Sequence, residues 1–181
     1  MDVQRKPVEY TIRRSEVGDY MAMRDVNRIA WERAYNHIYT DDEIHGLFED
    51  KLSQHGTWVE RRLERIATLV AETPGGIIGF CGVSILKGGD GEIVTLYIHP
   101  DYQNIGVGTA LWNAGLDLLR EAGCNTAWVW VLAKARAVAF YEHKGCVLTE
   151  KGTYTVGDHA ETTHGYTLEL LPTDDDTEDT D

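Results

Sequence analysis

The chain has 181 residues, enough for one domain with a substantial core, and carries 30 acidic against 17 basic side chains, a formal net charge of −13. This acid excess argues against nucleic acid as a partner, because phosphate binding needs clustered Lys and Arg. No apolar run approaches the roughly 18 residues of a membrane span, and the start "MDVQRKPVEY" lacks the apolar core of a signal peptide, so we expect a cytoplasmic protein without membrane contact.

In chain order, the sequence predicts strands where apolar and polar residues alternate or where a short apolar run is bounded by turn residues. It predicts helices where apolar residues recur every three to five positions, with glycine at the end. The predicted elements are a strand at 9–14, a helix at 15–34, helical segments at 39–54 and 57–66, a hairpin of strands at 66–72 and 77–86, a strand at 92–98, a helix at 107–122, a strand at 126–132, a helix at 134–145, and strands at 146–156 and 163–171. This order predicts an α/β (α+β) domain with a mixed sheet.

The charge is concentrated at the C-terminus, where six of the acids lie in the last ten residues, "PTDDDTEDTD". We interpret 172–181 as a disordered acidic tail. The acidic composition, with only six lysines, also fits a salty cytoplasm, which we keep as a hypothesis. Cys81, Cys124 and Cys146 are widely spaced and form no CxxC pair, so neither a disulfide framework nor a zinc site is expected.

The loop "QNIGVG", residues 103–108, lies between a predicted strand and a predicted helix. Free amides at a helix start, together with the helix dipole, attract anions, and glycines let backbone approach a phosphate closely. A pyrophosphate-bearing cofactor would suit such a loop, although a tight turn alone also explains the glycines. The loop is not a Walker motif, which ends in Gly-Lys-Ser/Thr, nor a Rossmann fingerprint, because Thr109-Ala-Leu follows Gly108.

The combination of Gln103, Gly106 and Gly108 after a strand that ends in "LYIHP" resembles the cofactor loop of the GNAT superfamily of acetyl-CoA-dependent N-acetyltransferases. Downstream, "KARAVAFYEHKGC" resembles the second signature of that family, Asn-x-x-Ala-x-x-Phe-Tyr-Glu-x-x-Gly-Phe. Two residues depart from it, because Lys134 stands in place of asparagine and Cys146 in place of phenylalanine. The residues that match this signature are Ala137, Phe140, Tyr141, Glu142 and Gly145.

The resemblance implies a single domain at 8–171, with a mixed central sheet of six to seven strands flanked by helices. It also implies that the fourth and fifth strands, 92–98 and 126–132, splay apart and hold the pantetheine arm of acetyl-CoA between them. No metal is expected, since backbone dipoles can hold the phosphate charge. The cofactor residues implied are Leu96, Tyr97, Ile98, Gln103, Asn104, Ile105, Gly106, Val107, Gly108, Thr109 and Phe140.

For acetyl transfer to an amine, one group must accept the amine proton and another must protonate the leaving thiolate. The resemblance makes Tyr141 the candidate acid, although a packed aromatic at a helix end is the alternative. It makes Glu92 the candidate base, because partial burial on an apolar strand would raise its pKa. Glu92 could instead be an exposed residue at the strand start, and ordered water could then act as the base.

The segment "AWERAYNHIYTDDEI" resembles the region that forms one wall of the acceptor site in many relatives. Trp31, Tyr35 and Tyr39, with Asp41 and Asp42, could attract a cationic amine through their rings and charges. Helix packing and capping are the alternative roles for these residues.

We therefore expect an acyltransferase that moves acetyl from acetyl-CoA to a primary amine of a small molecule or protein by direct attack. A non-catalytic sensor or scaffold that binds acyl-CoA is the alternative, and the acyl donor could also be larger than acetyl. A homodimer is common among relatives and is a further expectation.

Overall fold

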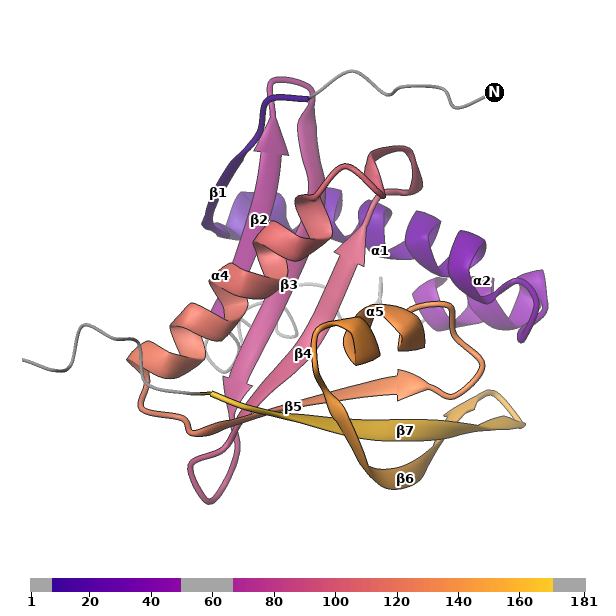
Figure 1. Cartoon of the computed structure of the whole chain (residues 1–181). Coiled ribbons are helices and arrows are strands. Elements are labelled where there is room, and N and C mark those ends of the chain that lie inside the picture. The colour runs from indigo at the N-terminus through magenta and orange to yellow at the C-terminus, as the bar shows by residue number, and fades with distance from the viewer. Residues whose placement is uncertain (1–7, 50–66, 171–181) are drawn as a thin grey trace, which may run out of the picture.

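The computed structural model describes residues 8–49 and 67–170, which form one domain around a seven-stranded mixed sheet (Figure 1). The strand order is β1-β2-β3-β4-β5-β7-β6. The strands are β1 Thr11–Arg14, β2 Ala67–Thr73, β3 Gly76–Ile85, β4 Gly91–Ile98, β5 Thr126–Leu132, β6 Val147–Val156 and β7 His159–Glu169. The α-helices are α1 Tyr20–Tyr35, α2 Asp41–Glu49, α4 Val107–Glu121 and α5 Val138–His143, and short 3-10 turns span η1 Val17–Asp19 and η2 Pro100–Tyr102.

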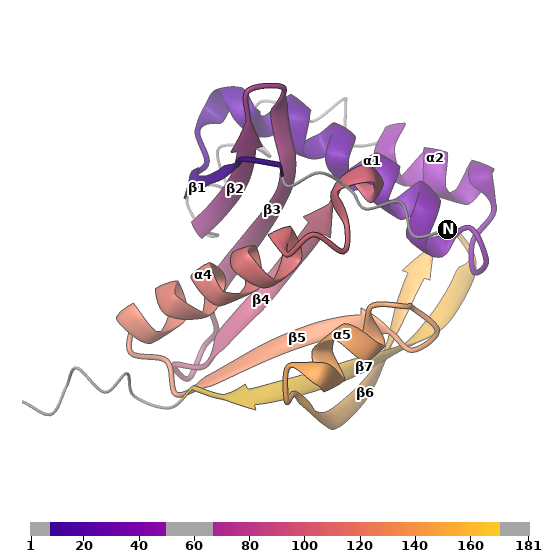
Figure 2. The same cartoon turned by 45° about the horizontal axis from the view of Figure 1, so that its top comes forward.

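Helices cover both faces of the sheet, and the alternation of side chains along β3 sets which helix packs where. Phe80 packs with Val26 of α1 on one face. The next residue, Cys81, faces Gly115 of α4 on the other face. Figure 2 shows the same arrangement, with α1 and α4 on opposite sides of β3 and β4.

Strands β4 and β5 are parallel neighbours that separate after a short contact. Their pairing is confined to Gly91–Ile93 opposite Ala127–Val129, although both strands continue beyond it. The β3–β4 register also shifts, because Gly82 pairs with Thr95 and Val83 with Ile93, which leaves Val94 as an extra residue in β4. Such a bulge bends and twists a strand. The predicted splay of the fourth and fifth strands is thus confirmed.

Three predicted elements differ from the structure in extent. The α-helix expected at 15–34 begins at Tyr20, because the chain first forms the 3-10 turn η1, in which the Asp19 amide donates to the carbonyl of Glu16. Helix α5 begins at Val138 rather than 134, because the chain turns first, with the Ala135 amide donating to the carbonyl of Leu132. Strand β7 begins at His159 rather than 163, because it pairs with β6 up to Val156 across a tight turn. Apolar residues are sparse in this hairpin tip, so the sequence pattern gave no sign of strand there.

Thr40 caps the start of α2. The Thr40 hydroxyl accepts a hydrogen bond from the Glu43 amide at 3.3 Å, and the Glu43 carboxylate accepts one from the Thr40 amide at 2.8 Å. This reciprocal pair satisfies two amides that the helix leaves free. The helix expected at 57–66 and the tail at 172–181 lie outside the described residues. Among the described helices, no segment is long and apolar enough to cross a membrane.

Candidate active site

The separation of β4 from β5 opens a cavity of about 510 Å³ between them. It is bounded by α1 on one side and by the segment from β5 into α5 on another, and it reaches the loop before α4. Leu96, Tyr97 and Ile98, which the resemblance implies as cofactor residues, line it.

The backbone of β4 presents free polar groups to this cavity. The His99 amide donates to the Ile78 carbonyl of β3 at 2.8 Å. Amide directions alternate along a strand, so the amides of Leu96 and Ile98 point the other way, toward β5, beyond the stretch where β5 pairs with β4. The carbonyl of Ile98 accepts a bond from Gln103 Nε2 at 3.1 Å. The Ile98 amide faces the gap beyond the pairing with β5.

The loop before α4 lies open at the end of the cavity. Gly106 is the N-terminal cap of α4 and adopts a φ of 93°, and a Cβ there would meet no atom within 4 Å. Asn104 also has a positive φ, 63°. The loop residues that line the cavity are Gln103, Asn104, Gly106, Gly108 and Thr109.

Two of the predicted loop residues face elsewhere. Val107 is fully buried in the core, and Ile105 packs against the same core, so neither lines the cavity. Any contact from these two residues with a ligand would therefore come from the backbone. The helix start itself favours an anion, because its first amides lack partners within α4.

Tyr141 and Phe140 of α5 both line the cavity on the side opposite α1. The Tyr141 ring is buried against Trp112, with 5.5 Å between ring centroids. Burial, reinforced by nearby Tyr97, raises the pKa of the Tyr141 hydroxyl, so it stays protonated near neutral pH. Within the described ranges it has no hydrogen-bond partner, and a protonated hydroxyl can donate to a ligand in the cavity.

Glu92 lies on the sheet face that carries Thr95 and Tyr97, deeper along β4 than either. It is half-buried, and burial raises the pKa of its carboxyl, opposed by a hydrogen bond from Ser84. Glu92 does not itself line the cavity, whereas Thr95 and Tyr97 do.

Of the aromatic residues predicted to form the acceptor wall, one lines the cavity and two lie in the core. Tyr35 lines the cavity, but Trp31 and Tyr39 are buried in the core and do not. Trp31 donates from Nε1 to the Tyr97 hydroxyl at 3.0 Å and stacks edge-on with Tyr35 at 4.6 Å, so it supports the wall from behind. Asp41 and Asp42 belong to the first turn of α2 and also lie outside the cavity lining.

Sequence reasoning missed three polar residues that line the cavity, namely Arg33, Thr95 and Arg136. The Thr95 hydroxyl oxygen is buried and has no hydrogen-bond partner among the described residues. A buried hydroxyl without a partner costs free energy, which a ligand or water in the cavity would recover. No local pattern marks Arg33, because only the fold shows that the helix face it shares with Ala30 and Ala34 lines the cavity.

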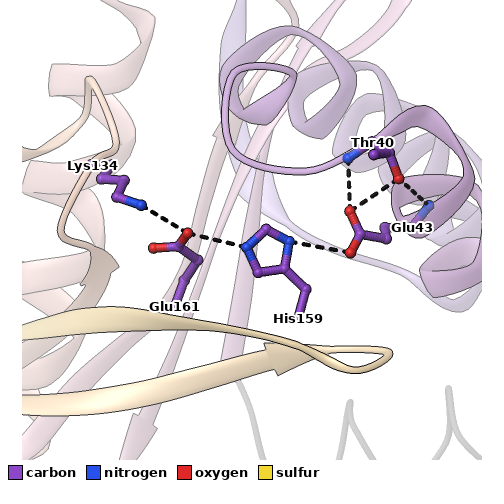
Figure 3. A network of polar contacts seen from close by, with 5 residues as sticks. All are labelled: Thr40, Glu43, Lys134, His159 and Glu161. Atoms are coloured by element: carbon purple, nitrogen blue, oxygen red, sulfur yellow. Dashed lines mark hydrogen bonds and ion pairs between the residues drawn. The ribbon is translucent and has the colours of Figure 1, made fainter.

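A network of polar contacts joins the β6–β7 hairpin to α2 and to the segment after β5 (Figure 3). His159 contacts Glu43 at 3.1 Å through Nδ1 and Glu161 at 3.2 Å through Nε2. Lys134 donates to Glu161 at 2.8 Å, and Thr40 bonds Glu43. Three segments that are distant in sequence are thereby connected beside the cavity wall.

No group of three or more His, Cys, Asp or Glu side chains in the described part of the chain could hold a metal ion. Comparison with known proteins identifies a family. The model of the acetyltransferase (GNAT) family matches residues 22–146. The chain belongs to this family.

Individual relatives of this acetyltransferase agree with the family match. An uncharacterised N-acetyltransferase of Bacillus subtilis, YuaI, is 26% identical over 140 residues, covering 73% of this chain and 77% of the relative. The PaiA N-acetyltransferase of Thermoplasma acidophilum, solved in complex with coenzyme A, superposes with a TM-score of 0.72 at 21% identity over 86% of this chain and 98% of that one. The yncA protein of Salmonella typhimurium, solved with acetyl-CoA, superposes with a TM-score of 0.64 at 19% identity over 91% of this chain and 96% of that one. The acetyltransferase is thus an acyltransferase with the family fold.

Proposed function

We propose that this acetyltransferase moves the acetyl group of acetyl-CoA to a primary amine by direct attack. The observation that carries the proposal is the cavity between β4 and β5, which extends from the open start of α4 to the Tyr141 side chain. An acyl donor with a phosphate at one end and a thioester at the other matches such a cavity. The solved relatives that hold coenzyme A and acetyl-CoA support the same donor.

The residues of this chain fit the donor in three ways. Amides at the start of α4 would bind the pyrophosphate, and Gly106 leaves space for its close approach. The free amides of Leu96 and Ile98 would bond the pantetheine arm in place of a β5 neighbour. The unpartnered Thr95 hydroxyl supplies one more polar contact in the same cleft.

In the reaction, the amine nitrogen forms a bond to the acetyl carbonyl carbon, and the bond from that carbon to sulfur breaks. A backbone amide of β4 near Ile98 would polarise the carbonyl oxygen, as backbone donors do in oxyanion holes. Glu92 would accept the amine proton, directly or through ordered water. Tyr141, kept protonated by burial, would donate its proton to the leaving thiolate.

The first experiment is calorimetric titration with acetyl-CoA and with desulfo-CoA, at low and high KCl, alongside measurement of thiol release with a panel of amines. Saturable binding with thiol release in the presence of an amine would support the proposal. Binding without release for every amine would favour the alternative, an acyl-CoA sensor. Absence of binding at both salt concentrations would refute the donor assignment.

A matched pair of variants tests the phosphate loop separately. Gly106→Glu adds a carboxylate at the start of α4, and we expect it to weaken donor binding at least tenfold through repulsion. Gly89→Glu is the control, because Gly89, in the turn between β3 and β4, has a similar φ, 97° against 93°, and also has no atom within 4 Å of a Cβ. Both variants carry the same strain of about 1–2 kcal/mol. Equal donor affinity in the two variants would contradict the loop assignment.

A further inference from the structure

The charged side chains that line the cavity are both basic, which is unexpected in a chain with a formal net charge of −13. They are Arg33 of α1 and Arg136 of the segment between β5 and α5. No Asp or Glu of the described residues lines the cavity. The cavity is therefore unsuited to holding a second cationic group of an acceptor.

The two arginines lie near one contact that joins the α1 wall of the cavity to the wall formed by the segment after β5. His37 Nε2 contacts the Lys134 carbonyl oxygen at 3.1 Å and so ties the end of α1 to the segment after β5. Arg33 lies one helical turn before His37, and Arg136 lies two residues after Lys134. Both arginines therefore line the cavity close to this contact in the chain.

Both arginines are also available to a ligand. They are exposed, and neither forms an ion pair or hydrogen bond with any residue in 8–49 or 67–170. Lys134, the neighbouring cation, is by contrast held by Glu161 at 2.8 Å (Figure 3). Arg33 in the last turn of α1 gains some stabilisation from the helix dipole, but this does not account for Arg136 or for the missing acids.

We propose that the acceptor carries an anionic group, a carboxylate or phosphate, beside its amine, and that Arg33 and Arg136 bind this group. The inference rests on the proposed function. Arginine presents donors in a planar fork that matches carboxylate and phosphate oxygens. The donor's own phosphates are the other source of such a group, but they already have the amides at the start of α4.

The test uses acceptor pairs that differ only in the anionic group, namely amino acids against their carboxamides and phosphoethanolamine against ethanolamine. Thiol release is measured for each acceptor. The values of kcat/KM are calculated from the concentration of unprotonated amine, so that a difference in amine pKa within a pair does not affect the comparison. We expect the anionic member to be preferred at least tenfold in one series. Arg33→Ala or Arg136→Ala should lower that preference about ten- to hundredfold, the range for losing a charge-assisted hydrogen bond.

Control measurements test whether the two arginines bind the acceptor or the donor. Arg14→Ala removes an exposed arginine at the end of β1, beyond the cavity lining, and should leave the preference unchanged. The KM for acetyl-CoA should stay within about twofold in Arg33→Ala and Arg136→Ala. The inference would be overturned if the variants raised the KM for acetyl-CoA, but not the KM for acetyl-dephospho-CoA, and left the acceptor preference unchanged. The arginines would then bind the donor.

The remaining outcomes distinguish this inference from the proposed function. Thiol release that favours the neutral member of every pair refutes the inference and leaves the acetyltransferase activity intact. Absence of thiol release with all amines refutes both. Urea unfolding of each variant checks that the substitutions leave the fold in place.

Discussion

The packing of α4 against the sheet provides a sharp test of the fold, because one glycine sets how closely the helix approaches. A Cβ added to Gly115 would lie 2.8 Å from Cys81 Sγ, 3.2 Å from Ile93 Cδ1 and 3.3 Å from Val83 Cγ1. All three neighbours are almost fully buried. Alanine favours a helix over glycine by about 1 kcal/mol, whereas overpacking a core costs about 1–3 kcal/mol. We therefore expect Gly115→Ala to destabilise the protein by about 1 kcal/mol.

The same exchange in α2 should have the opposite sign. Gly46 is exposed, and a Cβ there would meet no atom within 4 Å. With no clash to offset the helix preference, Gly46→Ala should stabilise the protein by about 0.5–1 kcal/mol. Urea unfolding followed by tryptophan fluorescence measures both free energies of unfolding, and equal m-values would license their comparison.

A double-mutant cycle identifies the clash. Cys81→Ala removes the sulfur atom nearest to the added methyl group, so Gly115→Ala should cost about 1 kcal/mol less in that background. A stabilising effect of Gly115→Ala in the wild-type background would refute the reasoning, since α4 could then move away from the sheet without loss. A coupling of zero would show that Ile93 and Val83, rather than Cys81, resist the methyl group.

Two further predictions concern catalysis. Tyr141→Phe should lower kcat about 10²- to 10⁴-fold with donor affinity intact, while the control Tyr35→Phe, in the same cavity, should change kcat little; full turnover by Tyr141→Phe would remove its role as acid. Because burial raises the pKa of Glu92, wild-type activity should fall as the pH drops through that raised pKa. Glu92→Gln should lower turnover most near neutral pH, and the difference from the wild type should shrink as the pH approaches the pKa of the amine substrate. An unchanged pH–rate profile would show that water, rather than Glu92, accepts the amine proton.

Most of the fold was predictable because its elements have strong periodic patterns. The buried strands β2 to β5 and the helix α4 follow short apolar runs or a clear helical stripe, and their predicted bounds lie within one or two residues of those observed. The β6–β7 hairpin was only partly predicted, because β7 begins at His159 rather than 163, in a tip with few apolar residues, although the bounds of β6 lie within one residue of those predicted. Its extent depends on cross-strand pairing, which a local pattern does not encode.

The site was predictable where a motif fixes backbone geometry and unpredictable where only the fold decides which way a side chain points. The loop at Gly106 and the aromatic pair at Phe140 and Tyr141 line the cavity as expected. Trp31 and Tyr39 look like binding residues in sequence but fill the core, because an aromatic ring serves both purposes equally well. Arg33 and Arg136 were overlooked because their proximity depends on the contact between His37 and Lys134, residues 97 positions apart.

The cavity exists because the sheet leaves part of β4 without a neighbour. Pairing with β5 stops at Ile93, and beyond the bulge the amides of Leu96 and Ile98 have lost the partners that a continuous sheet would supply. The Thr95 hydroxyl is buried in the same stretch without a partner among the described residues. Buried polar groups in this state are costly unless water or a ligand bonds them. A ligand that presents carbonyl and amide groups in a line, as a pantetheine arm does, can bond several of them at once. The same interruption of the sheet that weakens the strand pair thereby favours binding of an extended, amide-bearing donor.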